Sequence, residues 1–131
     1  MLVARGAMNQ RSILLIDADR DFHRLLSREL EAYGVDVVHV ADGQDALAKV
    51  PQLSPVAIVI AVDEPDKTGY SLCNKAKKGV AAQIPVILVT ATVSSEGFAN
   101  HRKLKIHADE YIDKRGMNTA ELIGKLDNLI Q

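Results

Sequence analysis

The stretch Ser54-Pro55-Val56-Ala57-Ile58-Val59-Ile60-Ala61-Val62-Asp63-Glu64-Pro65-Asp66-Lys67-Thr68-Gly69 decides how this chain folds. Its first half contains seven consecutive apolar residues, 56–62, of which five are valine or isoleucine. Side chains of this β-branched type pack well in strands, and an unbroken apolar run is typical of a strand covered on both faces of a parallel sheet. The acidic residues that follow, with Asp63 first, are therefore expected at the carboxyl end of a buried strand, where open α/β sheets place their sites.

Composition narrows the class of protein. The chain has 131 residues, enough for one domain, with 47% apolar and 25% charged residues. Sixteen basic and seventeen acidic residues give a net charge of -1, so we expect neither nucleic acid nor a membrane as a partner. A single cysteine, Cys73, cannot form an internal disulfide, and no apolar run approaches a membrane span, so we expect a cytoplasmic protein. We interpret residues 1–11 as a flexible leader or cloning remnant and 12–131 as the folded domain.

Apolar runs and amphipathic segments alternate along residues 12–131. The runs predict strands at 12–16, 35–40, 56–62, 84–91 and 110–113, and the periodic segments predict helices at 20–33, 44–50, 69–78, 95–105 and from 118 almost to the end. Boundary signals support these limits, namely Asp19 as an N-cap, Gly34 as a left-handed terminator, Pro51 as a stop and a capping box from Asn118 to Glu121. Five strands alternating with five helices predict a doubly wound α/β fold with right-handed crossovers.

Four motifs in this pattern resemble the receiver domains of bacterial two-component response regulators. They are ILLIDAD at 13–19, PDKTG at 65–69, IPVILVTA at 84–91 and ADEYIDK at 108–114. Each motif is weak alone, whereas all four in this order at the family's spacing are specific. The resemblance implies the flavodoxin-like receiver fold, a parallel five-stranded sheet in the order 2-1-3-4-5.

The resemblance also implies a chemistry, phosphoryl transfer to an aspartate with Mg²⁺ held by carboxylates. In the family, a lysine pairs with the phosphoryl group, a hydroxyl on the fourth strand bonds to it, and an aromatic residue on the fifth strand moves inward. Thr90 matches that hydroxyl, Tyr111 the aromatic residue and Lys114 the lysine. Asp17 matches the first of two adjacent acids that normally end the first strand.

Two positions depart from the family pattern. The position eight residues before Gly69, where the family has its nucleophile, is Ala61, and Ala18 stands in place of the second strand-one acid. A methyl group cannot attack phosphorus or bind a cation. We therefore expect no catalytic residue, no resident metal and no cofactor, with Mg²⁺ binding weak or absent. Arg115 replaces the usual cis proline, so we expect a trans bond before it.

Two rival functions depend on the acids that are present. The first is a phosphorylatable receiver that uses Asp63 with Mg²⁺. Asp63 lies two residues after Ala61, roughly 6.6 Å along an extended chain, too far for an in-line transfer built around position 61. The second is a small α/β enzyme that uses Asp17 and Asp63, against which stands the absence of a Ser-His or Cys-His arrangement, a glycine-rich phosphate loop or a cofactor motif.

The expected function is that of a pseudo-receiver and not of an enzyme. Such a module binds a protein partner in a bacterial signalling pathway, with motility control as one expected setting, and is not phosphorylated. The resemblance implies that the partner surface is formed by the helix at 95–105, the strand at 110–113 and the last helix. Thr90, Tyr111 and His101 are the expected switch and output residues. Lys114 is expected to form an ion pair with Asp17 or Asp63, because its ammonium needs compensation where it is partly buried.

Overall fold

The computed structural model describes residues 11–41, 43, 45–63, 68–79 and 82–130. Its five strands form one parallel sheet in the order β2-β1-β3-β4-β5, as expected. The strands are β1 (Arg11–Ile16), β2 (Val35–Val40), β3 (Ala57–Ala61), β4 (Val86–Thr90) and β5 (Glu110–Asp113). The helices are α1 (Arg20–Glu31), a 3-10 turn η2 (Leu47–Lys49), α2 (Val50–Leu53), α3 (Thr68–Lys78), α4 (Ser95–Arg102) and α5 (Thr119–Ile130).

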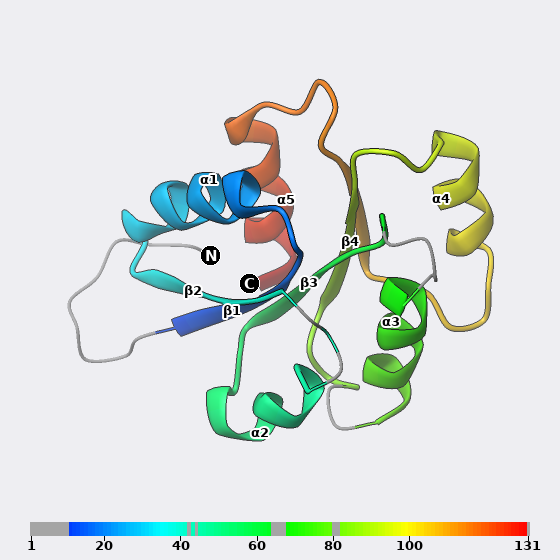
Figure 1. Ribbon diagram of the computed structural model, residues 1–131, viewed down its shortest axis with the longest axis horizontal. Helices are drawn as coiled ribbons and strands as arrows, with labels where there is room; N and C mark the ends of the chain where they lie inside the picture. Colours follow the sequence, from blue (N-terminus) through cyan, green and yellow to red (C-terminus); the bar gives the residue numbers. More distant parts are fainter. Residues whose placement is uncertain (1–10, 42, 44, 64–67, 80–81, 131) are drawn as a thin grey trace.

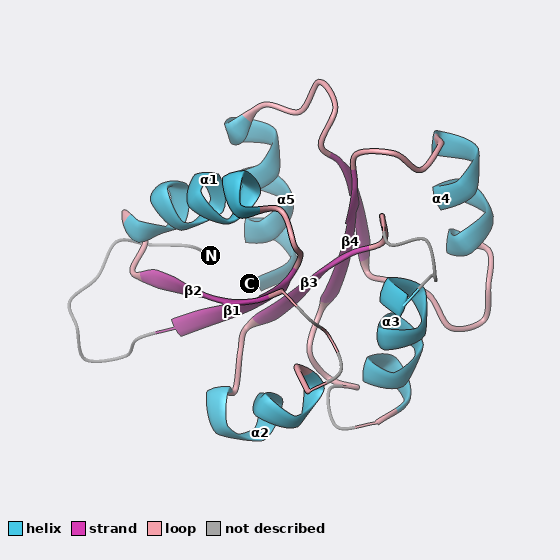
Figure 2. Ribbon diagram, viewed as in Figure 1, coloured by secondary structure: helices cyan, strands magenta, loops and turns pink. Residues whose placement is uncertain are grey.

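Helices cover both faces of the sheet (Figure 1). Helices α1 and α5 pack on one face, and α2, α3 and α4 lie on the other (Figure 2). Alternate residues of the central strands supply the two cores, so that Ile13 and Leu15 face α1 and α5 while Leu14 and Ile16 face the opposite helices. This double burial explains the unbroken apolar runs of β1, β3 and β4.

Helix boundaries follow the local signals in most places. The Asp19 carboxylate accepts the Phe22 N–H and caps α1, and Gly34 after this helix has a φ of 71°. The Asn118 side chain accepts the Glu121 N–H at 2.8 Å and caps α5. The Asp19 and Asn118 side chains each satisfy a backbone N–H that the first turn of a helix leaves without a partner. The positive φ of Gly34 is a conformation that glycine adopts without strain.

Several predicted limits were wrong by a few residues. Helix α1 ends at Glu31 instead of Tyr33, α4 ends at Arg102 instead of Lys105, and β1 begins at Arg11, one residue before the predicted start. The strand predicted at 56–62 is ordered as β3 over 57–61, and the strand predicted at 84–91 as β4 over 86–90.

The short helix predicted at 44–50 was wrong in type and position. The described residues form a 3-10 turn at 47–49, and α2 follows from Val50 with Pro51 in its first turn. Proline is favoured there because the first turn has no use for its missing N–H, so Pro51 starts a helix that it was expected to stop. Gln44, the predicted first residue, lies outside the described residues.

Helix α3 packs close to the end of β3. A Cβ atom added to Gly69 would lie 2.2 Å from the Ala61 carbonyl oxygen and 3.0 Å from the Val62 Cα. Glycine therefore allows the first turn of α3 to approach the strand at the edge where the predicted site lies. No helix in the described ranges has the length and hydropathy of a membrane span.

Candidate functional site

The carboxyl edge of the sheet brings together Asp17 after β1 and Lys114 after β5. The Lys114 ammonium lies 2.7 Å from Asp17 Oδ2 and 3.1 Å from Asp19 Oδ2. The Lys114 and Asp17 side chains are only 10% and 5% exposed, so this is a largely buried ion pair. Of the two predicted partners of Lys114, Asp17 and Asp63, the structure shows the ion pair with Asp17.

Further contacts hold this ion pair in place. Asp17 Oδ1 accepts the Asp19 N–H at 2.9 Å, so both carboxylate oxygens of Asp17 have partners. The Lys114 ammonium lies 4.5 Å from the centre of the Phe22 ring, a cation–π contact. His39 Nε2 donates to the Asp17 carbonyl oxygen at 2.5 Å. The polar atoms of Asp17 are therefore occupied by the chain itself.

Asp63 makes a second set of contacts, with the segment that follows β4. Its carboxylate accepts from the Thr90 hydroxyl, from the Thr92 hydroxyl at 2.8 Å and from the Ala91 N–H at 2.9 Å. Burial raises the pKa of Asp63, but these hydrogen bonds and the Lys114 charge outweigh it, so the pKa lies below its ordinary value. Asp63 is therefore an ionised anchor for the β4–α4 loop.

Thr90 is fully buried at the end of β4. Besides donating to Asp63, its hydroxyl accepts the N–H groups of Thr92 at 3.0 Å and Val93 at 2.8 Å. The side chain that matches the switch hydroxyl thus shapes the turn into α4, and its donor is used by a carboxylate of the same chain.

Alanine occupies the two remaining positions of the predicted acidic site. Ala61 is the last residue of β3 and pairs with Val89 of β4, while Ala18 lies exposed in the turn after β1. Neither side chain offers a nucleophile or a ligand atom.

The residues present do not fit the magnesium ion that the family implies. Mg²⁺ prefers octahedral oxygen coordination and is usually held by carboxylates. Ala18 and Ala61 have no oxygen in their side chains, and Asp17 already binds an ammonium group and an N–H. Across the described ranges, no cluster of three or more acidic, histidine or cysteine side chains could hold a metal.

A second polar network lies on the α4 side of β5 and contains two predicted output residues. Tyr111 is 5% exposed, and its hydroxyl accepts the Ala108 N–H at 3.1 Å and lies 2.5 Å from His101 Nδ1. Burial lowers the pKa of His101, as does the nearby His107, so the folded state favours the neutral imidazole, whose Nδ1 can accept a hydrogen bond from the Tyr111 hydroxyl. Tyr111 is therefore held inward.

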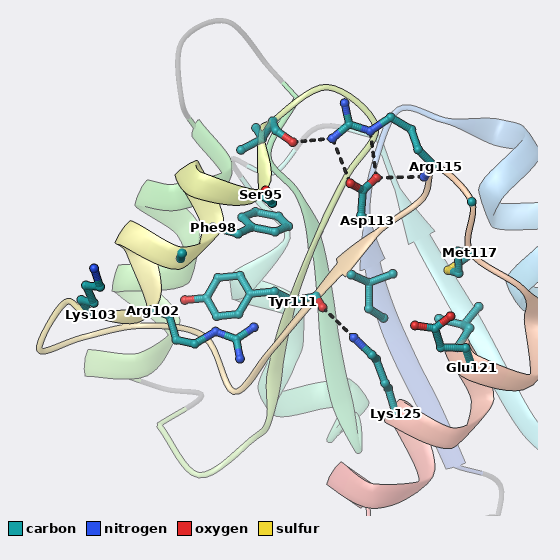
Figure 3. Close-up of a pocket in the computed structure, with 15 residues that line it drawn as sticks. Ser95, Phe98, Arg102, Lys103, Tyr111, Asp113, Arg115, Met117, Glu121 and Lys125 are labelled. Carbon is teal, nitrogen blue, oxygen red and sulfur yellow. Dashed lines mark hydrogen bonds and ion pairs between the residues drawn. The ribbon is translucent and has the colours of Figure 1, made fainter.

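A groove of about 570 Å³ opens between α4, β5 and α5 (Figure 3). Apolar side chains of all three elements line it, including Phe98, Ile112 and Leu122, and Tyr111 lies beside them. Charged side chains surround this apolar surface, namely Arg102, Lys103, Asp113, Arg115, Glu121 and Lys125. The expected partner surface is thus a concave face, and the largely buried Tyr111 forms part of its wall.

Sequence reasoning missed three contributors to these networks. Thr92 binds Asp63, Asp19 pairs with Lys114 as well as capping α1, and His39 binds the Asp17 carbonyl. Asp19 could have been found, because it lies two residues after Asp17 at the same sheet edge. Thr92 and His39 had no sequence signal, since their roles depend on how a loop and a neighbouring strand are placed.

Comparisons with known proteins agree with this architecture. Residues 13–127 match the family model described as response regulator receiver domain. A probable transcriptional regulator, ycf27, of Porphyridium aerugineum is 32% identical over 82% of this chain and 43% of its own length. The adventurous-gliding motility protein Z of Myxococcus xanthus is 26% identical over 79% of this chain and 8% of its own length.

Solved structures show the same fold. The CheY-like response regulator receiver domain protein of Methanospirillum hungatei aligns with a TM-score of 0.78 and 26% identity, covering 93% of this chain and 94% of that one. The chain spans less than half the length of the two curated relatives named above, so the activities of those whole proteins are not carried over with the fold.

Proposed function

Because this chain belongs to the response regulator receiver domain family, we propose that it is a pseudo-receiver, a signalling module that acts without being phosphorylated. It binds a protein partner through the face formed by α4, β5 and α5, in the cytoplasm of a bacterial cell. One observation carries the proposal: alanine replaces the nucleophile at position 61, and the acids of the carboxyl edge bind groups of the same chain.

The chemistry of the carboxyl edge supports a pseudo-receiver over a phosphorylatable receiver or a small enzyme. A phosphoryl transfer needs a free carboxylate oxygen in line with the donor and a cation that neutralises the developing charge. Asp63 is tied to Thr90, Ala91 and Thr92, and the Lys114 ammonium is engaged by Asp17 and Asp19. A hydrolase that uses Asp17 and Asp63 would have to break the same contacts, so we propose no enzymatic activity.

The output face supports a role in partner binding. A ligand shifts a conformational equilibrium only if it binds one state better than the other. Here two hydrogen bonds, to His101 and to the Ala108 N–H, hold Tyr111 inward. The partner therefore recognises a face whose aromatic residue is already positioned, with Thr90 held by Asp63 behind it.

We also propose motility control as the setting of this signalling. The similarity to a protein named for adventurous gliding motility supports it, although most of that protein lies outside the matched region. The similarity to transcriptional regulators supports a regulatory pathway in general.

The alternative function, in which Asp63 accepts a phosphoryl group, is tested by incubating the protein with acetyl phosphate and Mg²⁺ and measuring its intact mass. We expect no added phosphoryl group. A phosphoryl adduct that disappears in Asp63→Ala would overturn the proposal and establish the acceptor function.

The partner surface is tested with three variants, each first checked for normal folding by NMR. We expect Tyr111→Ala and His101→Phe to lose partner binding or cellular output, because they remove the inward tyrosine or its hydrogen-bond acceptor. Asp63→Ala should keep both. Loss of output in Asp63→Ala alone, with both surface variants active, would contradict a pseudo-receiver.

A further inference from the structure

The mouth of the α4–β5–α5 groove carries more positive than negative charge. Four cationic side chains and two acidic ones line the groove, although the whole chain has a net charge of -1. The excess is thus local to this face. The positive charge is not spread equally around the rim of the groove. Arg115 is neutralised by Asp113, which it contacts through Nε and through a second guanidinium nitrogen, each at 2.9 Å.

Two of the cations share one carboxylate. Glu110 Oε1 lies 3.7 Å from the Arg102 guanidinium and 3.9 Å from the Lys125 ammonium, both longer than a hydrogen bond, and it accepts the Tyr111 N–H at 2.8 Å. Two positive charges thus face one negative charge that a backbone N–H also engages. An acidic group from outside would complete this arrangement.

Arg102 is placed to receive that group. Its guanidinium lies 4.6 Å from the centre of the Tyr111 ring, and its side chain is 58% exposed. Figure 3 shows Arg102 beside the Tyr111 ring at the mouth of the groove, with Lys125 entering from α5 and donating to the Tyr111 carbonyl. Stacking on the ring orients a guanidinium whose five N–H donors match the two oxygens of a carboxylate.

We propose that the groove binds a partner segment in which a carboxylate lies next to a large apolar side chain. The apolar side chain enters the groove between α4 and α5, and the carboxylate binds Arg102 with support from Lys125. Arg102 is thereby the residue that selects an acidic partner. This inference rests on the proposed function, because it assumes that the α4–β5–α5 face is the partner surface.

The first test uses two synthetic peptides titrated into the isotope-labelled chain and followed by NMR. Both peptides carry a central Phe-Leu pair, flanked by glutamates in one and by glutamines in the other. We expect the acidic peptide to bind at least about tenfold more tightly, about 1.4 kcal/mol, with saturable shifts at the amides of Arg102, Tyr111 and Lys125. Raising the salt concentration should weaken its binding.

Variants of the chain identify the recognising group. Arg102→Glu should weaken the acidic peptide at least tenfold, and Arg102→Lys should fall between it and the unchanged chain, because lysine lacks the planar fork. Lys78→Glu, the same charge reversal at an exposed residue of α3, is the matched control and should bind normally. Equal binding of the two peptides, no saturable shift at the groove, or full binding by Arg102→Glu overturns the inference.

A cellular assay separates this inference from the proposed function. If Tyr111→Ala loses output and Arg102→Glu keeps it, the face is used but the partner is not selected by its acidic group. If both variants keep output, the proposed partner surface fails as well. We expect both to lose output, with Lys78→Glu normal.

Discussion

The carboxyl edge of the sheet and the groove between α4, β5 and α5 differ in how their polar groups are satisfied. At the edge, Lys114 pairs with Asp17 and Asp19, and Asp63 binds the loop after β4. At the groove, Arg102 and Lys125 share one distant carboxylate and border an apolar cavity. The edge is closed by its own contacts, whereas the groove is the region that we propose for partner binding.

This difference separates a region whose polar groups hold the fold from the region that we propose for partner binding. The edge uses its charged residues to join β1, β3, β4 and β5, a structural role that needs no phosphoryl group. The groove contains the atoms that a partner could contact. Changes at the edge should therefore affect stability first, and changes at the groove should affect binding first.

Lys114→Met is expected to have the largest effect on stability. It leaves the buried Asp17 carboxylate without its cation, which typically costs about 3–5 kcal/mol when one partner of a buried pair is removed. Urea unfolding of the variant measures this loss. Asp17→Asn combined with Lys114→Met should recover part of it, because the uncompensated charge is removed. An unchanged unfolding free energy would show that the edge is not held by this pair.

Asp63→Ala is expected to lower the free energy of unfolding by about 1–3 kcal/mol, because it leaves the donors of Thr90, Ala91 and Thr92 without their acceptor. Denaturant unfolding measures this loss of stability, and Asp21→Ala is the control, because the Asp21 carboxylate is exposed. The same variant should keep partner binding, because Asp63 lies at the edge and not at the groove. Loss of partner binding with an unchanged free energy of unfolding would contradict these separate roles of the edge and the groove.

A smaller effect is expected from pH, through His101. Burial holds its folded-state pKa below the ordinary 6.5, so the folded state favours the neutral imidazole. The stabilisation is fully present above the unfolded pKa and is lost as pH falls through the folded pKa. Unfolding free energy should therefore fall between pH 7 and 5.5.

The matched variants for this pH effect are His101→Phe and His23→Gln. His23 also has a pKa lowered by burial, by His39 and by Arg24, and it contributes with the same sign from α1. Each variant should make the free energy of unfolding less dependent on pH, by the contribution of the histidine that it removes. If the unfolding free energy of His101→Phe depends on pH as steeply as that of the unchanged chain, the His101 imidazole of α4 does not titrate with folding.

The smallest effect is expected from Mg²⁺, which should leave the melting temperature and the amide spectrum unchanged at low millimolar concentration. Saturable shifts around Asp17 and Asp63 would contradict this. Restoring carboxylates with Ala18→Asp and Ala61→Asp together should create measurable binding, because the added oxygens supply ligands that the edge lacks.

Much of the fold could be predicted because its signals are local or periodic. The apolar runs of β1, β3 and β4 and the caps at Asp19 and Asn118 depend on neighbouring residues in the chain. The short segment around Pro51 was harder, since one proline can end a helix or begin one.

The sequence by itself determined which side chains stand at the predicted site, because alanine at positions 18 and 61 has no nucleophile or ligand atom in any conformation. It also determined the parallel α/β class, through strands that are apolar on both faces. Only the tertiary structure decided that Lys114 binds Asp17 and Asp19, that Asp63 binds Thr90 and Thr92, and that Arg102 lies over Tyr111. These contacts join residues of separate strands, helices and loops, and their distances depend on how the elements pack.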